Sequence, residues 1–330
     1  MNSNNQYEGT GNEMIKTRLV RLLSHAKKYI VYNVMWQWMA LIAQVVSVFT
    51  IAGLFGKLYA KKAASGDIVK CACVFAAVLV VRFLCDKMAA GASYKASVDV
   101  KCILRDKIYE KLLKLGVSYN EKIATSEVVQ LSTEGVEQLE IYFGKYLPQL
   151  FYSILAPVTL FIVLAAKASI KAGVVLLLCV PLIPASIVAV QKIAKKLLNN
   201  YWGIYTELGD SFLENLQGLT TLKIYQADGM KAEQMDEEAA EFRKITMKVL
   251  TMQLNSTSVM DIVAYGGAVV GMIVALSEFL KGNITLEQTL CIVLLASEFF
   301  IPLRLLGSFF HIAMNGMAAS DKIFGLLDLE

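Results

Sequence analysis

The chain has 330 residues, of which 56% are hydrophobic and only 18% are charged, and its mean hydropathy is +0.53. A soluble domain typically carries about 25% charged residues, so this composition indicates a membrane protein. The formal net charge of +4 is small and spread along the chain, which excludes the clustered basic face of a nucleic-acid-binding protein.

Six apolar stretches are long enough to cross a bilayer, whose hydrocarbon core takes about 20 helical residues. In chain order we expect spans at approximately 29–56, 68–90, 146–166, 172–191, 249–277 and 285–311. The first span contains no charge, and a polar tail, residues 1–15, precedes its basic flank. The second span is interrupted by Arg82, the fourth holds Pro181 and Pro184, and the fifth contains Asp261.

The connections between the predicted spans differ greatly in length. Two of them, at about 91–145 and 192–248, are long, charged and rich in helix formers, so we expect helices that continue beyond the bilayer. Gly116 is a typical helix stop inside the first connection. Lysines and arginines gather directly before the first span, which predicts a cytoplasmic N-terminus and places both long connections in the cytoplasm. Thr285 and Gln288 form a capping-box pattern that predicts the start of the sixth span.

Several segments resemble the transmembrane domain of type 1 ABC exporters. They are "EKIATSEVVQLSTEGVEQLEIYF" (121–143), "FLENLQGLTTLKIYQAD" (212–228), "GNITLEQTLCIVLLASEFFIPLRLLGSFF" (282–310) and "AASDKIFGLLD" (318–328). The resemblance implies an all-α membrane domain over residues 16–325, with six transmembrane helices, long cytoplasmic extensions and coupling helices. It also implies that residues 326–330 begin a linker to a nucleotide-binding domain.

In such exporters, coupling segments dock onto the ATPase. The resemblance places Glu127 in the first coupling segment and Glu214, Gln217 and Gly218 in the second, although each fits a solvated helix-tip residue equally well when taken singly. No phosphate loop of the form GxxxxGK[ST] occurs in the sequence. We therefore expect ATP and Mg²⁺ to be bound by a nucleotide-binding domain, in the same or a separate chain, and no cofactor in this segment itself.

Two stretches narrow the resemblance within the family. "EGVEQLEIYFGKYLPQLFYSILAPVTLF" and "FFIPLRLLGSFFH" are most similar to CydD-type halves of the CydDC exporters that support cytochrome bd assembly. This implies the bacterial cytoplasmic membrane, a CydC-like second half, and cysteine, glutathione or haem as the molecule bound. A homodimeric multidrug, lipid or peptide exporter is the alternative, for which we expect a more uniformly apolar cavity. A non-transporting membrane scaffold is a further alternative.

Charged residues inside membrane spans are costly and usually face a cavity or a partner. Positions seven apart nearly superimpose on a helix, so Ser297, Arg304 and His311 are predicted to share one stripe, extended by Asn315. Together with Arg82, these residues are predicted to line a substrate or haem cavity. Arginine binds carboxylates in a bidentate manner, and histidine is a candidate haem ligand.

A structural interpretation of the same residues remains open. Arg304 could pair with Asp261 or Glu298 to join two helices, and His311 could bond a backbone carbonyl. For the two acids, Asp261 and Glu298, we expect this structural role.

Overall fold

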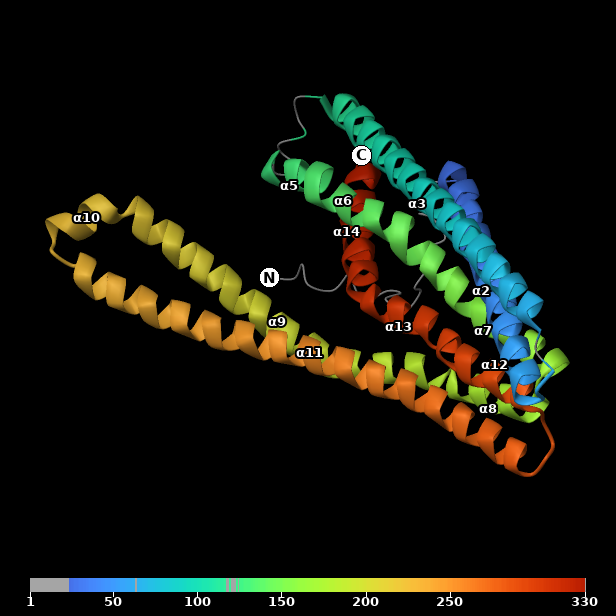
Figure 1. Ribbon diagram of the computed structural model, residues 1–330. Coiled ribbons are helices and arrows are strands. Elements are labelled where there is room, and N and C mark those ends of the chain that lie inside the picture. The colour runs from blue at the N-terminus through green and yellow to red at the C-terminus, as the bar shows by residue number, and fades with distance from the viewer. Residues whose placement is uncertain (1–23, 63, 117–118, 120–122, 124, 330) are drawn as a thin grey trace. The chain divides into compact units, whose positions relative to one another are not determined.

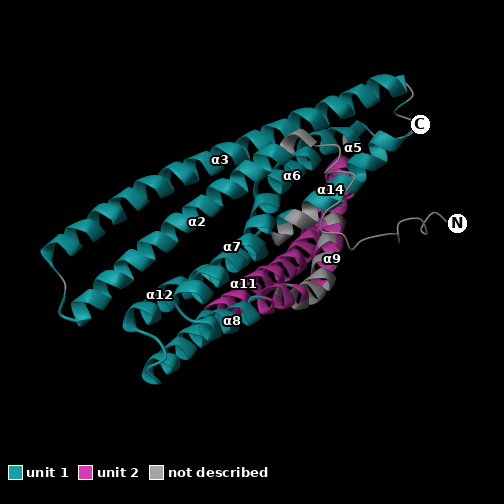
Figure 2. Cartoon of the chain, turned by 90° about the vertical axis from the view of Figure 1, so that its right-hand side faces the viewer, with its two compact units in different colours: residues 1–180, 267–330 teal, residues 181–266 magenta. Residues whose placement is uncertain are grey.

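The computed structural model describes residues 24–62, 64–116, 119, 123 and 125–329, and every regular element among them is a helix (Figure 1). The predicted all-α class is therefore confirmed. The chain divides into two compact units (Figure 2): a first unit of residues 1–180 and 267–330, and a second unit of residues 181–266. The predicted polar tail, residues 1–15, lies outside the described residues.

The first unit begins with an antiparallel helix pair, α2 (Ser24–Tyr59) and α3 (Ser65–Leu115). The turn between them is closed by an ion pair in which Lys57 Nζ lies 2.8 Å from Asp67 Oδ1. Helix α3 has 51 residues, so at about 1.5 Å per residue it is roughly 77 Å long, far more than a bilayer core of about 30 Å. It ends at Gly116, whose φ of 62° suits glycine, as the sequence predicts.

The next rod runs from residue 125 to residue 167 and contains two π-helical turns. Its parts are α5 (Thr125–Gln130), η2 (Leu131–Gly135), α6 (Val136–Ile141), η3 (Tyr142–Tyr146) and α7 (Leu147–Lys167). Single π turns inside α-helices frequently occur at functional sites. Here η3 packs against α3 at the point where the predicted third span begins.

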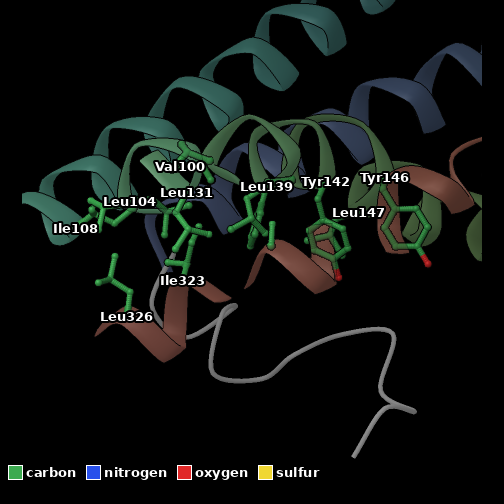
Figure 3. Packing of buried hydrophobic residues seen from close by; sticks show 14 of the residues in the cluster. Val100, Leu104, Ile108, Leu131, Leu139, Tyr142, Tyr146, Leu147, Ile323 and Leu326 are labelled. Atoms are coloured by element: carbon green, nitrogen blue, oxygen red, sulfur yellow. The ribbon is translucent and has the colours of Figure 1, made fainter. Parts of the chain in front are cut away.

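A buried hydrophobic cluster holds the extended ends of these helices together (Figure 3). Val100 and Leu104 of α3 contribute to it with Leu131 and Leu139 of the second rod, and the last helix, α14 (Phe310–Asp328), adds Ile323. Each of these side chains is at most 4% exposed. Burial of a large aliphatic side chain contributes about 1.5–3 kcal/mol, so this cluster fixes α14 against α3.

The predicted fourth span is interrupted. Helix α8 (Ile170–Cys179) ends before a turn at Val180 and Pro181, and α9 (Leu182–Gln217) begins beyond it. Pro181 has no backbone N–H and therefore cannot donate a helical hydrogen bond to α8, which favours a break at this position. Position 180 is also where the first unit gives way to the second.

The second unit is built from α9, the short α10 (Leu219–Ile224) and the beginning of α11 (Asp228–Leu280). The ring centroids of Tyr201 and Tyr205 on α9 lie 5.6 and 5.7 Å from that of Phe242 on α11. These aromatic contacts hold α9 and α11 together. Helix α11 has 53 residues, and its part from 267 onward belongs to the first unit.

The predicted sixth span forms a helical stretch long enough to cross a membrane, Leu286–Ser308, but with a local break inside it. It consists of α12 (Leu286–Ala296), a 3₁₀ turn η4 (Ser297–Phe299) and α13 (Ile301–Ser308), followed after Phe309 by α14. Pro302 removes one helical N–H, which favours the break at η4. The start is as predicted: the Thr285 hydroxyl accepts a hydrogen bond from the Gln288 N–H at 3.3 Å, and the Thr285 N–H donates to Gln288 Oε1 at 2.9 Å.

Among the described residues, five helices are long and apolar enough to cross a membrane. They are Lys27–Tyr59, Ser65–Leu115, Glu127–Lys167, Asp228–Leu280 and Leu286–Ser308. At the predicted fourth span the chain has a shorter apolar helix, Ile170–Ser186. The predicted multi-pass architecture is confirmed, while the count of six rests on this shorter, broken segment.

Candidate functional site

The first unit encloses a cavity of about 440 Å³ among α2, α3, the η3–α7 rod and the broken helix around η4. Its wall is polar for a membrane-spanning domain. The polar lining residues are Asn33, Gln37, Gln44, Arg82, Asp86, Ser93, Lys145, Gln149, Tyr152 and Glu298. Polar groups in a span are costly unless they face a cavity or a partner, so their convergence on one cavity marks it as the candidate site.

Helix α2 supplies three amide side chains to the cavity. Asn33, Gln37 and Gln44 are four and then seven residues apart, so they lie on one helical face of an otherwise apolar span. The Gln37 amide donates to Asn33 Oδ1 at 2.6 Å, and the Asn33 amide donates to the Ala89 carbonyl of α3 at 2.7 Å. These bonds hold the amide groups of α2 in place beside α3.

Helix α3 supplies a matching polar face. Arg82, Asp86 and Ser93 follow a spacing of four and then seven residues. The Arg82 guanidinium donates from Nη1 to Gln44 Oε1 at 2.5 Å, which orients it. A guanidinium has five N–H donors, and this bond uses one, so Arg82 keeps the capacity to bind an anion in the cavity.

The π turn η3 forms another part of the wall. Gly144 contacts α3 so closely that a Cβ atom there would lie 3.4 Å from the Ser93 carbonyl oxygen and overlap Ser97 Oγ. The Ser93 hydroxyl donates to the Gly144 carbonyl at 2.5 Å. This close approach at glycine places the neighbouring Lys145 at the cavity.

The opposite wall comes from α7 and the broken sixth helix. Gln149 is buried, and its amide donates to the carbonyl of Pro302 at 2.8 Å, which joins α7 to α13. Glu298 lies in the 3₁₀ turn η4 and lines the cavity together with Tyr152 of α7. The lining therefore combines two acids, Asp86 and Glu298, with two bases, Arg82 and Lys145.

The structure separates the predicted cavity residues into groups. Arg82 lines the cavity, and Glu298, for which a structural role was expected, lines it too. That the cavity binds a substrate or haem stays a prediction. Ser297 and Arg304 are partly buried and are not among its described lining residues. The predicted stripe needs an unbroken helix, and η4 and the Phe309 turn change the helical phase between these positions.

The remaining predicted cavity residues lie elsewhere. The side chains of His311 and Asn315 are outside the described part of the chain. Asp261 is on α11 within the second unit. The amide groups of α2 were missed by a search for charges, although their spacing of four and seven residues on one helical face was a readable signal.

The predicted coupling residues stand at helix ends. Glu127 is exposed in the first turn of α5. Glu214 and Gln217 are exposed in the last turn of α9, and Gly218 joins α9 to α10, with its N–H bonded to the Glu214 carbonyl at 2.8 Å. In this turn the side chains of Glu214 and Gln217 face solvent. Their predicted contact with an ATPase stays a prediction.

Comparisons with known proteins agree with this architecture. The family described as the ABC transporter transmembrane region matches residues 28–303. An uncharacterized ABC transporter ATP-binding protein of Haemophilus influenzae is 54% identical over 89% of this chain and 52% of its own length. The glutathione/L-cysteine transport protein CydD of the same organism is 29% identical, with coverage of 69% and 40%. An ATP-dependent lipid A-core flippase of Photobacterium profundum is 25% identical, with coverage of 69% and 39%. The chain thus spans about half the length of these relatives, or less.

Proposed function

Because the chain belongs to the ABC transporter transmembrane family, we propose that it lines the translocation pathway of an ATP-driven exporter that carries a small thiol compound, cysteine or glutathione. The observation that supports this substrate class is the cavity whose lining includes two bases, Arg82 and Lys145, and two acids, Asp86 and Glu298. Three relatives, one at 29% and two at 25% identity, are named as glutathione/L-cysteine transport proteins.

The cavity chemistry matches a zwitterion with peptide groups. A carboxylate would bind Arg82, while the ammonium group of the same molecule would face Glu298 or Asp86. The amides of Gln37 and Gln149 can donate to and accept from peptide groups. A volume of about 440 Å³ lies within the range of roughly 300–1,000 Å³ that small-molecule sites occupy.

Two other cargoes remain as alternatives to the thiol. Haem could bind through its propionates at Arg82, and His311 would be its axial ligand. A lipid or multidrug cargo is the other rival, since one relative is named a lipid A-core flippase. A mixed-charge, amide-rich wall suits a polar zwitterion better than a large apolar molecule, which is why we favour the thiol compound.

The proposal also includes the partners. A nucleotide-binding domain would supply ATP hydrolysis and contact the segments around Glu127 and Glu214. A second half-transporter of the CydC type would complete the pathway. We place the assembly in the bacterial cytoplasmic membrane with the N-terminus in the cytoplasm.

Uptake of labelled glutathione and cysteine into inside-out vesicles that contain the complete transporter tests the substrate class. We expect Arg82→Gln to weaken the apparent affinity about 10- to 100-fold, the loss expected for one hydrogen bond to a charged group. Arg304→Gln, a charge change of the same kind outside the cavity lining, should change the affinity no more than about twofold by the same reasoning.

Two results would contradict the proposal. If the two arginine variants lose uptake equally, the cavity around Arg82 is not the binding site. If neither thiol is taken up, while the purified transporter gives a Soret shift with haem that His311→Ala abolishes, the cargo is haem.

A further inference from the structure

A second hollow lies on the surface of the first unit, between α2 and the η3–α7 rod. It has a volume of about 550 Å³ and is lined almost entirely by apolar side chains. The lining residues are Lys27, Ile30, Val31, Val34, Met35, Trp38, Phe143, Leu147, Phe151 and Leu155. We call this hollow the α2–α7 groove.

The groove has a closed floor and open walls. Ile30, Phe143 and Leu147 are at most 6% exposed and form the floor. Val31 on α2 is 63% exposed and Phe151 on α7 is 47% exposed, so they form the rims. On the rod the lining positions recur every fourth residue from 143 to 155, which makes them one continuous ridge of that helix.

The length of the groove matches one leaflet of a bilayer. From Lys27 to Trp38 the helix advances about 16 Å at about 1.5 Å per residue. Half of a hydrocarbon core of about 30 Å is about 15 Å. An extended acyl chain of one leaflet would therefore run the whole groove, with its end near Trp38.

Among the described lining residues, one is charged, Lys27, and it stands at one end of the groove. Lys27 lies directly before residues 29–56, which carry no charge, so its ammonium group lies at the level of the lipid headgroups. Ile30 belongs to the same buried cluster as Val100 and Ile323, which places this end on the side to which α3 and α14 extend. On the opposite end, the Trp38 indole N–H is satisfied by Thr159 Oγ1 at 3.0 Å.

We propose that the α2–α7 groove holds one anionic phospholipid of the leaflet at whose surface Lys27 stands. The acyl chain lies on Ile30, Phe143 and Leu147, and the phosphate group binds the Lys27 ammonium. Charge complementarity and the one-leaflet length argue for this occupant. The inference requires a membrane protein and is independent of which molecule the cavity around Arg82 carries.

The test uses the complete transporter, purified in detergent, depleted of lipid and titrated with phosphatidylglycerol or with phosphatidylcholine of identical acyl chains. Native mass spectrometry counts the lipids bound to each assembly. We expect one phosphatidylglycerol per groove, bound about fivefold more tightly than phosphatidylcholine, which is the preference that one lysine near a charged surface supplies. Lys27→Gln should reduce the preference to nearly one.

Matched controls separate the groove from the general surface. Lys28→Gln removes the neighbouring charge, which lies over the Tyr29 ring, and should leave the preference unchanged. Val31→Trp fills the groove and should abolish the bound lipid, whereas Val46→Trp, at an exposed position of α2 outside the groove, should retain it. Equal lipid binding by Val31→Trp and the unmodified protein would overturn the proposal. The proposal would also be overturned if the second half-transporter covers the groove, so that the intact assembly binds no lipid there.

Discussion

The glycine at position 271 shows how one residue fixes the distance between two helices. A Cβ atom at Gly271 of α11 would lie 2.7 Å from Cγ of Leu176, a side chain of α8 that is 0% exposed. Small residues at helix crossings let backbones approach closely in membranes. Leu176 is fully buried, so a Cβ atom at position 271 would have to displace a side chain inside the core.

Gly271→Ala should therefore destabilise the first unit by about 1–3 kcal/mol through overpacking. Gly266→Ala is the matched control, because no atom lies within 4 Å of a Cβ built there, and alanine also favours the helix. The midpoint of thermal unfolding in detergent is the measurement. A midpoint for Gly271→Ala equal to that of the control would show that α8 and α11 are not in this contact.

Charges inside apolar spans were a useful signal in the sequence, since that search found both Arg82 and Glu298. It did not identify their common cavity, because nothing in a sequence says which faces of α3 and the sixth helix meet. The side chains of Asn33, Gln37 and Gln44 are neutral amides, so charges within the spans do not indicate them. Their shared helical face is the pattern that such a search should include.

At the scale of the elements, the breaks in the helices matter as much as the helices. Local chemistry was enough to predict three features of the helices. These are the extension of the helices beyond the spans, the start of α12 at Thr285 and Gln288, and the stop of α3 at Gly116. The break before Pro302 has a local cause as well, but the 3₁₀ turn that turns Glu298 toward the cavity depends on packing with α7. The two π turns have no sequence signal that we can identify.

The bond from Gln149 to Pro302 is a direct polar link between α7 and α13. Replacing Gln149 by leucine keeps the volume nearly constant and removes the donor. We expect a loss of about 0.6 kcal/mol and at most about 1.7 kcal/mol in the free energy of unfolding, the average and the maximum measured for hydrogen bonds between membrane helices. Gln149→Glu retains an acceptor but no amide donor and should not restore the stability.

The comparison variant for this test is Thr159→Val, which removes the acceptor of the Trp38 indole bond between α2 and α7. Its effect should be smaller, because Thr159 lies in a more exposed part of the interface than the buried Gln149. Unfolding in denaturant, followed by tryptophan fluorescence, compares the variants. A loss for Gln149→Leu below that for Thr159→Val would contradict the role of the Pro302 bond.

For the whole molecule, the sequence was sufficient to predict a multi-pass helical membrane domain whose helices continue beyond the bilayer. The composition indicates a membrane protein, and the spacing of apolar and charged residues indicates where its helices lie. The division into two units was not predictable, because it depends on long-range contacts. The boundary between the units lies at the break at Val180 and Pro181. In the sequence this break is visible only as two prolines in one predicted span.

The turn around Gly218 leads to a prediction at this scale that depends on the proposed function. Glu214 and Gln217 are exposed, so a Glu214→Ala, Gln217→Ala double variant should fold normally. We expect it to lose most transport at an unchanged substrate affinity, because the contact with the ATPase would be weakened. Glu207→Ala, an exposed position nearer the middle of α9, should transport normally.

Vesicle uptake and ATP hydrolysis, measured together on the complete transporter, distinguish the outcomes. A double variant that transports as well as Glu207→Ala would remove these two residues from the coupling contact. A change in substrate affinity, instead of in the rate, would place their effect at the cavity.

Helix α3 carries Arg82 in the cavity and Leu104 in the buried cluster on a single uninterrupted helix. A shift of the cluster that moves this helix also moves the guanidinium, with no side chain changing its rotamer. Free energy linkage is reciprocal, so in the proposed exporter any nucleotide state that weakens the binding of cargo at Arg82 would itself be disfavoured by bound cargo, by the same factor. A cargo that binds tightly in the cavity would therefore shift the equilibrium between the nucleotide states of the proposed ATPase.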